Sequence, residues 1–265
     1  MRDSLSEMAV LLASLALAAP PSPGAPIPRD PAPLAARLDS TTRGLAAAVD
    51  RWQPRTGRVP DDVTLYALYQ QRILLLLGGR PKLAKAVFRR LPGSPLRSEV
   101  LARSELGRLS KPQPLSAFRT GPAEPADRLR SYYLEARRRF GVAWNVLAAV
   151  NYVESAFNKL RNASSAGAQG PMQFIPSTWR RYGLGGNVHD PHDAILGAAN
   201  YLHANGAPGN YRRALFRYNP SSFYVDAVLR YAGRIRSDPR AYYVFYSRQV
   251  FVRTPRGLVR LTGPR

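Results

Sequence analysis

One carboxylate stands alone in the middle of the chain, at the end of an apolar stretch with helical spacing. Between Arg137 and His189 the sequence contains no acidic residue other than Glu154. Glu154 lies four residues after Val150 and seven after Leu147, so on a helix it shares their apolar face or its edge. Burial at such a place raises the pKa of a carboxyl group and keeps it protonated near neutral pH. The pattern therefore indicates a general acid, and it favours cleavage of a glycosidic bond.

Taken alone, Glu154 also fits a surface residue near a helix C-terminus, and the segment after it favours the catalytic interpretation. That segment combines tight backbone turns with two side chains that can face a ligand: Gly167, Gly170, Pro171, Met172 and Gln173. Glycines let a backbone approach a substrate closely. The amide of Gln173 can both donate to and accept from an N-acetyl group. Further along, the hydroxyl of Tyr218 and the amide of Asn219 close a predicted helix and are placed to orient Glu154.

Four motifs in a fixed order carry a family resemblance. They are ESAF at 154–157, SAGAQGPMQFIPSTW at 165–179, DPHDAI with AANYL at 190–202, and YN at 218–219. In this order and spacing they resemble the SLT-type lytic transglycosylases, which have a goose-lysozyme-like fold. Within that family the motifs are most similar to the membrane-bound B-type branch. The resemblance covers residues 127–236, a little under half of the chain.

The resemblance implies a function for each matching position. Glu154 would be the single catalytic acid/base. The implied substrate-binding residues are Ser165, Met172, Gln173, Tyr218 and Asn219. No cofactor is implied. Where some members carry an Asp/Gly-rich calcium loop, this chain has GLGGNVHD at 183–190, which offers too few oxygen ligands, so no metal is expected.

The number of carboxylates decides which reaction is expected. A hydrolase needs a second carboxylate about 5–9.5 Å from the acid. The nearest later candidates, Asp190 and Asp193, more plausibly cap the helix that follows them. Without a second carboxylate, the substrate's own C6 hydroxyl attacks C1, and cleavage of the MurNAc-β-1,4-GlcNAc bond leaves a 1,6-anhydroMurNAc end. Two alternatives stay open: a lysozyme-like muramidase on the same fold, and a non-catalytic cationic protein that binds cell wall or nucleic acid.

Two other groups of residues allow more than one interpretation. The histidines His189, His192 and His203 are weak candidates for metal ligands, and solvated or capping positions are favoured for them. The aromatic residues of the C-terminal stretch could form a sugar-stacking platform, although core packing is favoured: Tyr242, Tyr243, Tyr246 and Phe251.

The charge of the chain is extreme. Lys and Arg number 39 against 17 Asp and Glu, which gives a formal net charge of +22. Such a chain is attracted to polyanions, so anionic wall polymers are expected partners beside the peptidoglycan glycan strands. Basic residues are spread along the chain with no long run interleaved with aromatics, and we expect no specific nucleic-acid partner. The absence of cysteine excludes disulfides, a cysteine nucleophile and a lipid-modified cysteine.

The N-terminal segment reads as an export signal. Residues 8–19 are apolar, too few to span a bilayer, and ALA at 16–18 fits a small-x-small cleavage site. We therefore expect a signal peptide over 1–19, a secreted or envelope location, and a monomeric mature chain without a membrane span. A retained anchor and an ordinary terminal helix are the alternatives. Seven prolines make residues 20–33 an expected extended, unpacked linker.

Helical patterns dominate the rest of the sequence. The region 34–126 should hold helices near 34–52, 63–77, 81–91 and 99–109, the last within a loosely ordered connector. Residues 127–236 should form the lysozyme-like domain. The tail, 237–265, has β-prone runs at 242–246, 250–252 and 258–261 that suggest a hairpin or meander. The expected fold is mainly α: a lysozyme-like helical catalytic domain with an N-terminal helical extension and a short C-terminal β-prone segment.

Overall fold

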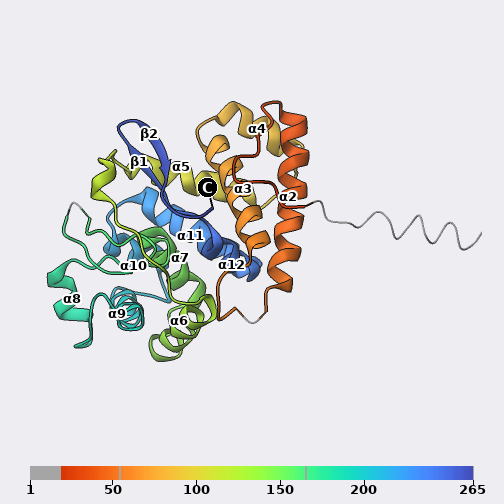
Figure 1. Ribbon diagram of the computed structural model, residues 1–265. Helices are drawn as coiled ribbons and strands as arrows, with labels where there is room; N and C mark the ends of the chain where they lie inside the picture. Colours follow the sequence, from red (N-terminus) through yellow and green to blue (C-terminus); the bar gives the residue numbers. More distant parts are fainter. Residues whose placement is uncertain (1–18, 54, 165, 265) are drawn as a thin grey trace, which may run out of the picture.

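The computed structural model describes residues 19–53, 55–164 and 166–264, and these are mainly helical, as the sequence predicts (Figure 1). The expected signal peptide, 1–19, lies outside the described residues except for its last position. The N-terminal helices are α2 (Pro31–Arg51), α3 (Asp61–Gly78), α4 (Pro81–Arg89) and α5 (Leu96–Leu109). After a 3-10 turn (Leu115–Ala117) come α6 (Ala126–Phe140), α7 (Trp144–Ser155), α8 (Pro176–Tyr182), α9 (Pro191–Ala204), α10 (Tyr211–Tyr218), α11 (Ser222–Ser237) and α12 (Arg240–Ser247). Nowhere in the described ranges does a helix combine the length and apolarity that a bilayer crossing requires.

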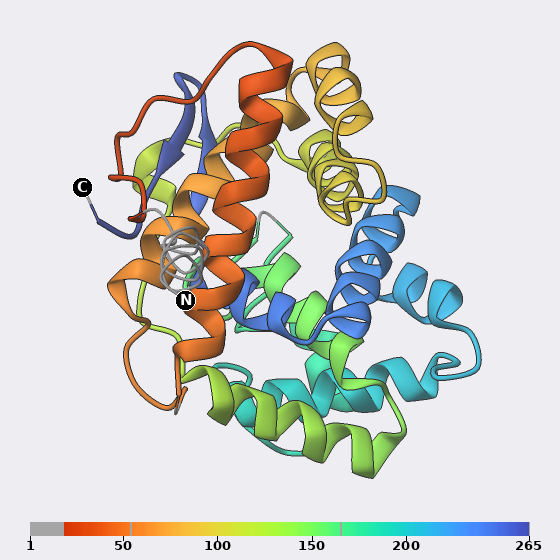
Figure 2. The same ribbon diagram turned by 90° about the vertical axis from the view of Figure 1, so that its right-hand side faces the viewer.

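The helices are arranged around α7 and α11. In Figures 1 and 2, α2, α3 and α4 lie side by side at one end of the molecule, and α6, α8, α9 and α10 lie at the other. Between them, α11 packs against α5, α7, α10 and α12. Helix α7, which ends one residue after Glu154, is therefore covered on several sides by other helices. This burial gives the end of α7 the poorly solvated surroundings that the sequence predicts for Glu154.

One hydrophobic core joins the N-terminal helices to the rest of the chain. Leu45 and Val49 of α2 and Tyr66 of α3 belong to the same buried cluster as Leu147 of α7 and Val228 of α11. A second, smaller cluster lies between α2, α3, α4 and α5. The boundary expected at residue 126 therefore marks a change of sequence pattern within one continuous packing unit. The division of the chain into functional domains at this boundary stays a prediction.

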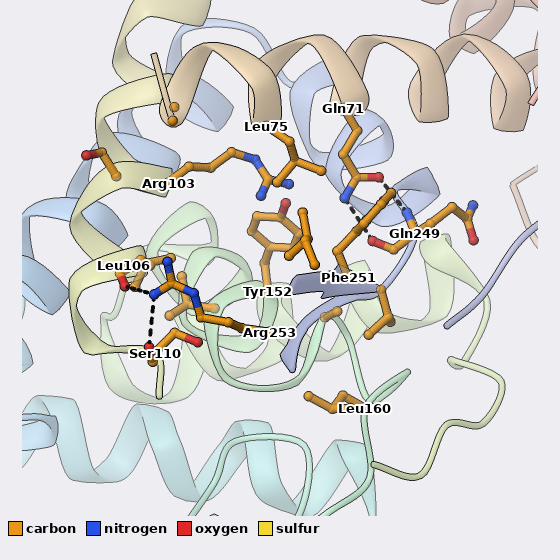
Figure 3. Close-up of a pocket in the computed structure, with 18 of the residues that line it drawn as sticks. Gln71, Leu75, Arg103, Leu106, Ser110, Tyr152, Leu160, Gln249, Phe251 and Arg253 are labelled. Carbon is orange, nitrogen blue, oxygen red and sulfur yellow. Dashed lines mark hydrogen bonds between the residues drawn. The ribbon is translucent and has the colours of Figure 1, made fainter. Parts of the chain in front are cut away.

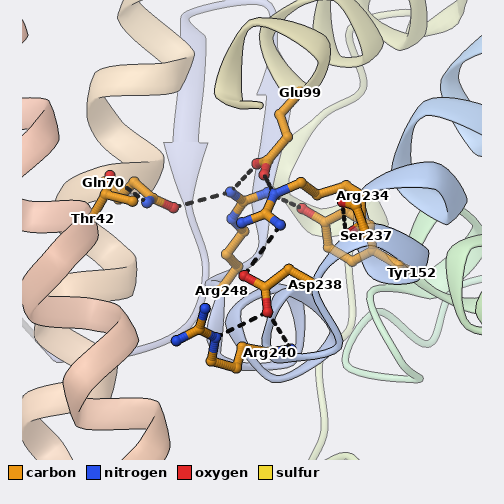
Figure 4. A network of polar contacts seen from close by, with 9 residues as sticks. All are labelled: Thr42, Gln70, Glu99, Tyr152, Arg234, Ser237, Asp238, Arg240 and Arg248. Atoms are coloured by element: carbon orange, nitrogen blue, oxygen red, sulfur yellow. Dashed lines mark hydrogen bonds and ion pairs between the residues drawn. The ribbon is translucent and has the colours of Figure 1, made fainter. Parts of the chain in front are cut away.

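A buried ionic network also ties distant segments together (Figure 4). Glu99 of α5 is ion-paired with Arg248, which follows α12, and its Oε1 lies 3.5 Å from Nε of Arg234 in α11. Arg248 also donates to Oε1 of Gln70 in α3, at 3.3 Å. Glu99 and Arg248 are almost fully buried, with side-chain exposures of 2% and 1%. The network fixes α5 and the C-terminal segment in one position relative to α3 and α11.

Two expectations for the flanking segments are wrong. Residues 242–246 read as β-prone but lie in helix α12, because their aromatic rings fill the core on a helical face. In the Pro-rich segment 20–33, residues 31–33 already belong to α2, and the part before them packs on α3: Arg72 donates to the carbonyls of Pro23 and Ala25, and Tyr69 donates to that of Pro26. The helix expected near 99–109 is present as α5, and its residue Ala102 belongs to the main core, so this part of the connector is packed.

The C-terminal hairpin is confirmed. Strands β1 (Phe251–Thr254) and β2 (Gly257–Arg260) pair antiparallel, with Val252 opposite Val259. The hairpin is fastened to the end of α5, since Nη1 of Arg253 donates to the carbonyls of Gly107 and Ser110 at 3.2 and 3.3 Å. As a result, the hairpin and α5 form adjoining walls on the same side of α7.

Candidate active site

Glu154 occupies the last turn of α7, where the chain changes direction abruptly. The helix stops at Ser155 because the next three residues have left-handed backbone angles, with φ of 50° at Ala156, 64° at Phe157 and 67° at Asn158. This conformation disfavours residues with a Cβ by about 1–2 kcal/mol each. Three consecutive left-handed residues therefore need support from their surroundings, and they turn the backbone sharply just after Glu154.

Support comes from a buried polar network beneath the bend. The hydroxyl of Ser155 donates to the carbonyl of Pro171 at 2.6 Å and accepts from the backbone N–H of Asn158 at 2.8 Å. Asn151, one turn earlier, donates to the same Pro171 carbonyl at 2.9 Å and accepts from the hydroxyl of Tyr133 at 2.6 Å. Buried hydrogen bonds of this kind are expensive to leave unmade. They therefore fix the loop that contains Pro171 against the end of α7.

The surroundings of Glu154 change its acidity. Burial raises the pKa of Glu154 from 4.5 to about 7, and a hydrogen bond from Tyr224 partly opposes the rise. The hydroxyl of Tyr224 lies 2.6 Å from Oε1 of Glu154 and donates to it. Glu154 can therefore hold its proton near neutral pH, where an ordinary carboxyl group is ionised. This agrees with the direction of the shift that the sequence predicts.

Tyr218 and Tyr224 form a pair beside Glu154. Their rings are parallel within 3° and their centroids lie 6.5 Å apart. The hydroxyl of Tyr218 donates to the carbonyl of Met172 at 2.6 Å, so it holds the loop and does not orient Glu154. Burial and the charge of Glu154 both raise the pKa of Tyr218. The orienting hydroxyl that the sequence analysis assigns to the Tyr218–Asn219 pair is thus supplied by Tyr224.

The glycine-rich loop is held close to its neighbours. Gly170 has a φ of +74°, and a Cβ at this position would lie 1.9 Å from the carbonyl oxygen of Val188. Gln173 also has a positive φ, 51°, and its side-chain nitrogen donates to the carbonyl of Gly170 at 3.0 Å. The side chain of Met172 is fully buried. The loop therefore approaches α7 through its backbone, in a conformation that glycine at 170 permits.

Glu154 is one of the residues that line a cavity of about 780 Å³. Figure 3 shows this cavity from close by. Its walls come from the end of α7, from α3 and α5, and from the C-terminal hairpin. The volume falls within the range of about 300–1,000 Å³ that is usual for ligand sites. Among the described residues that line this cavity, Glu154 is the single carboxylate; the cationic side chains are Arg103, Arg108 and Arg253. The cavity is therefore positively charged whenever Glu154 is protonated.

The structure brings together most of the residues that the sequence predicts for the site. Met172, Tyr218 and Glu154 lie around one point, and Gln173 follows directly on the same loop. Asn219 is half-buried and ends α10. Ser165 lies outside the described residues. None of the four described substrate-binding candidates lines the cavity, so their contacts with sugar remain predictions.

Sequence reasoning missed the residues that position the acid. Asn151 and Ser155 are four apart in a mainly apolar helix, and this spacing is a usable signal for a buried polar contact. Tyr133 and Tyr224 carry no such signal, because tyrosines in amphipathic helices usually pack in the core. Only the fold shows that Tyr224, 70 positions after Glu154, reaches the carboxylate.

Asp190, His192 and Asp193 lie at the N-terminal end of α9. Oδ1 of Asp190 accepts from the backbone N–H of Asp193 at 3.1 Å and caps α9, as predicted. Oδ2 of Asp193 accepts from the backbone of Asn187, and His192 contacts Glu135 at 2.9 Å. Ligand atoms of Asp190, His192 and Asp193 lie within 4.8 Å of one another, but these side chains are already engaged in capping and pairing. The arrangement gives no reason to assign a metal to them.

Comparisons with known proteins agree on the central segment. Residues 131–237 match the family model of the transglycosylase SLT domain. Membrane-bound lytic murein transglycosylase F of Thiobacillus denitrificans is 30% identical over 122 residues, which cover 43% of this chain and 26% of that protein. Membrane-bound lytic murein transglycosylase F 1 of Alkalilimnicola ehrlichii is 33% identical over 86 residues, 32% of this chain and 17% of that protein. The chain thus spans about a quarter or less of these relatives, and no solved structure gives a significant match. The likeness to the B-type branch stays a prediction.

Proposed function

We propose that this chain, whose residues 131–237 are a transglycosylase SLT domain, is a lytic transglycosylase that cleaves the glycan strands of peptidoglycan. The names of two relatives support the substrate class. The observation that carries the proposal is the state of Glu154: a carboxyl group with a pKa of about 7, beside a cavity whose described lining holds no other carboxylate.

Glu154 supplies the proton in the first step. A general acid works best when its pKa lies near the operating pH, because it is then both protonated and able to give up its proton. Protonated Glu154 donates to the glycosidic oxygen as the bond from C1 of MurNAc to that oxygen breaks. The GlcNAc side leaves as a neutral alcohol, and positive charge develops at C1, where the substrate's N-acetyl group stabilises it.

Glu154 also completes the reaction. Its carboxylate now accepts the proton of the C6 hydroxyl of the same MurNAc ring while that oxygen bonds to C1. The product is a 1,6-anhydroMurNAc end, and Glu154 regains its proton. A nucleophile tethered within the substrate has a large effective concentration. A second carboxylate that activates water, as an inverting hydrolase needs at about 6.5–9.5 Å, is therefore unnecessary.

Other residues of the site bind and orient. Tyr224 holds Oε1 of Glu154, which leaves Oε2 free to face the glycosidic oxygen. The proposed sugar contacts are those that the family resemblance implies: Ser165, Met172, Gln173, Tyr218 and Asn219. For Met172, whose side chain is buried, the available contact is through its backbone.

The location and partners belong to the same proposal. We infer that the chain is exported by its N-terminal segment and acts as a monomer in the cell envelope, with no cofactor. A net charge of +22 would retain it on anionic wall polymers. Equal retention at low salt on walls with and without those polymers would contradict this part.

The proposed activity is tested by mass spectrometry of the fragments released from purified peptidoglycan. The full chain should release anhydro-ended muropeptides, and Glu154→Gln should release none. Reducing-end fragments would instead indicate a muramidase. No fragments from either protein would support a wall-binding protein without catalysis.

A further inference from the structure

The cavity beside Glu154 has a wall that the SLT domain does not supply. Residues 131–237 contribute the end of α7, Leu160 and Tyr231, whereas α3, α5 and the hairpin lie outside that segment. Figure 3 shows the side chain of Arg103 reaching from α5 into the cavity, toward Tyr152 and Leu75. A ligand that Glu154 cleaves would therefore meet a surface built by the flanking segments of this chain.

Arg103 has no counter-charge within the described part of the chain. Its Nε is buried without a hydrogen-bond partner, and the side chain forms no ion pair there. Glu99, one turn away on α5, is ion-paired with Arg248 and Arg234. Glu105, two residues after Arg103, is ion-paired with Arg230. Figure 4 shows Glu99 directed at those two arginines. A half-buried guanidinium without a partner is costly to maintain, and a bound anion would relieve that cost.

The other cations of the cavity are held by neutral groups. Arg253 donates to the carbonyls of Gly107 and Ser110, and the guanidinium of Arg108 lies over the ring of Phe223 at 4.8 Å. Because these partners are neutral, the positive charges of Arg253 and Arg108 are not balanced by them. With Glu154 protonated, the described lining contains three cations and no anion. The field in the cavity therefore favours a negatively charged ligand.

We propose that Arg103 binds a carboxylate carried by the muramyl side chain of the substrate, and that this wall selects peptidoglycan over uncharged chitin-like glycans. The inference rests on the proposed function. The lactyl ether at C3 of MurNAc lies on the ring whose C1 is attacked, so this substituent leaves the glycan close to Glu154. That substituent ends either in the carboxylates of the stem peptide or, where the peptide is absent, in the lactyl carboxylate. The planar guanidinium of arginine suits either one through paired hydrogen bonds.

The test compares Arg103→Gln with Arg103→Lys in the full chain. The substrates are glycan strands with their stem peptides and strands stripped of peptide, each with free carboxylates and with the carboxylates converted to amides. The matched control is Arg97→Gln, which removes one positive charge from the exposed face of the same helix. Melting temperatures are recorded so that a folding defect is recognised.

We expect Arg103→Gln to raise KM about 10-fold on carboxylate-bearing strands, with kcat nearly unchanged. In Arg103→Lys, which keeps the positive charge, KM should lie between the values of wild type and Arg103→Gln. Amidation of the substrate should abolish the difference from wild type. An effect confined to peptide-bearing strands assigns the stem peptide, and one that persists on stripped strands assigns the lactyl group. Equal KM values for wild type and Arg103→Gln, or an effect that survives amidation, would overturn the inference. If wild type cleaves no strand at all, the proposed function fails instead.

Discussion

The hydroxyl of Tyr224 in α11 donates a 2.6 Å hydrogen bond to Oε1 of Glu154 in α7, and it connects the two helices at the point where the proposed acid works. Tyr224 is itself buried, with 2% exposure, so it cannot follow Glu154 into solvent. The hydrogen bond therefore restricts the direction of the Glu154 carboxyl group, and it also lowers the pKa of that group. Both effects matter for the proposed catalysis.

Removing this hydroxyl should change rate and pH dependence together. In Tyr224→Phe, Glu154 loses the hydrogen bond that lowers its pKa, so its pKa should rise further above about 7. Because the protonated form is the active acid, the fall in activity on the alkaline side should move to higher pH. We also expect kcat to fall about 10-fold from lost orientation. Rates measured from pH 5 to 9 check both; Tyr69→Phe, whose hydroxyl donates to Pro26, is the control. An alkaline limb that moves to lower pH would contradict the assignment.

The raised pKa of Glu154 has a consequence for stability. A carboxyl with a pKa of 4.5 in the unfolded chain and about 7 in the folded one binds more protons when folded. Its contribution to stability is therefore fully present below pH 4.5 and is lost as pH rises through 7. Glu154→Gln has no charge to desolvate, so at pH 8 it should be more stable than wild type by about 1–3 kcal/mol, with little such gain at pH 4.

Urea unfolding of both proteins at pH 4 and pH 8 measures this difference. If Glu154 instead ionises normally, the gap between the two proteins would be the same at both pH values. That result would remove the physical basis for its role as the acid.

The loop over α7 should depend on glycine at position 170. In Gly170→Ala, the new Cβ would meet the carbonyl oxygen of Val188, so the loop must shift from its position beside α7. Displacement of substrate-positioning groups by about 1 Å can lower activity about 100-fold. Gly167→Ala is a matched control, since its φ is also positive, +77°, but a Cβ there meets no atom within 4 Å. Activity assays with melting curves should separate the two variants; equal losses would show that backbone strain alone is responsible.

The buried network should make the N-terminal helices part of one folding unit. Glu99→Gln leaves Arg248 and Arg234 without their shared carboxylate in the interior, which should cost about 3–5 kcal/mol. The control Asp39→Asn breaks a surface pair with Arg43 and should cost about 0–1 kcal/mol. Guanidinium unfolding should show one cooperative transition, displaced in Glu99→Gln. Two transitions, with only one displaced, would indicate that residues 34–126 fold independently.

The sequence predicts the helices well where the apolar period is regular. Helix α4 begins at the expected residue, Pro81, and α3 begins within two residues of its expected start. The prediction from sequence is wrong at 242–246. A run of tyrosines is β-prone in isolation, and only the packing of Tyr242 and Phe245 into the core selects a helix. The packed course of residues 20–33 was also unpredictable, since the arginine and tyrosine that hold it lie on α3.

For the site, the sequence predicts the acid and not its surroundings. Glu154 stands out because no other acid is near it along the chain and an apolar helix precedes it. The groups that act on it come from elements far away in sequence: Tyr224 from α11, and Arg103 in the wall of the cavity from α5. Such contacts depend on how helices pack, which local spacing does not reveal.

The central claim is that Glu154 acts without a second carboxylate, so that no water enters the product. Digestion of purified peptidoglycan in ¹⁸O-labelled water, followed by mass spectrometry of the released fragments, tests it directly. The account predicts anhydro-ended fragments that carry no label, formed by wild type and not by Glu154→Gln. Fragments with labelled reducing ends would contradict it, because they would show that a water molecule attacks C1.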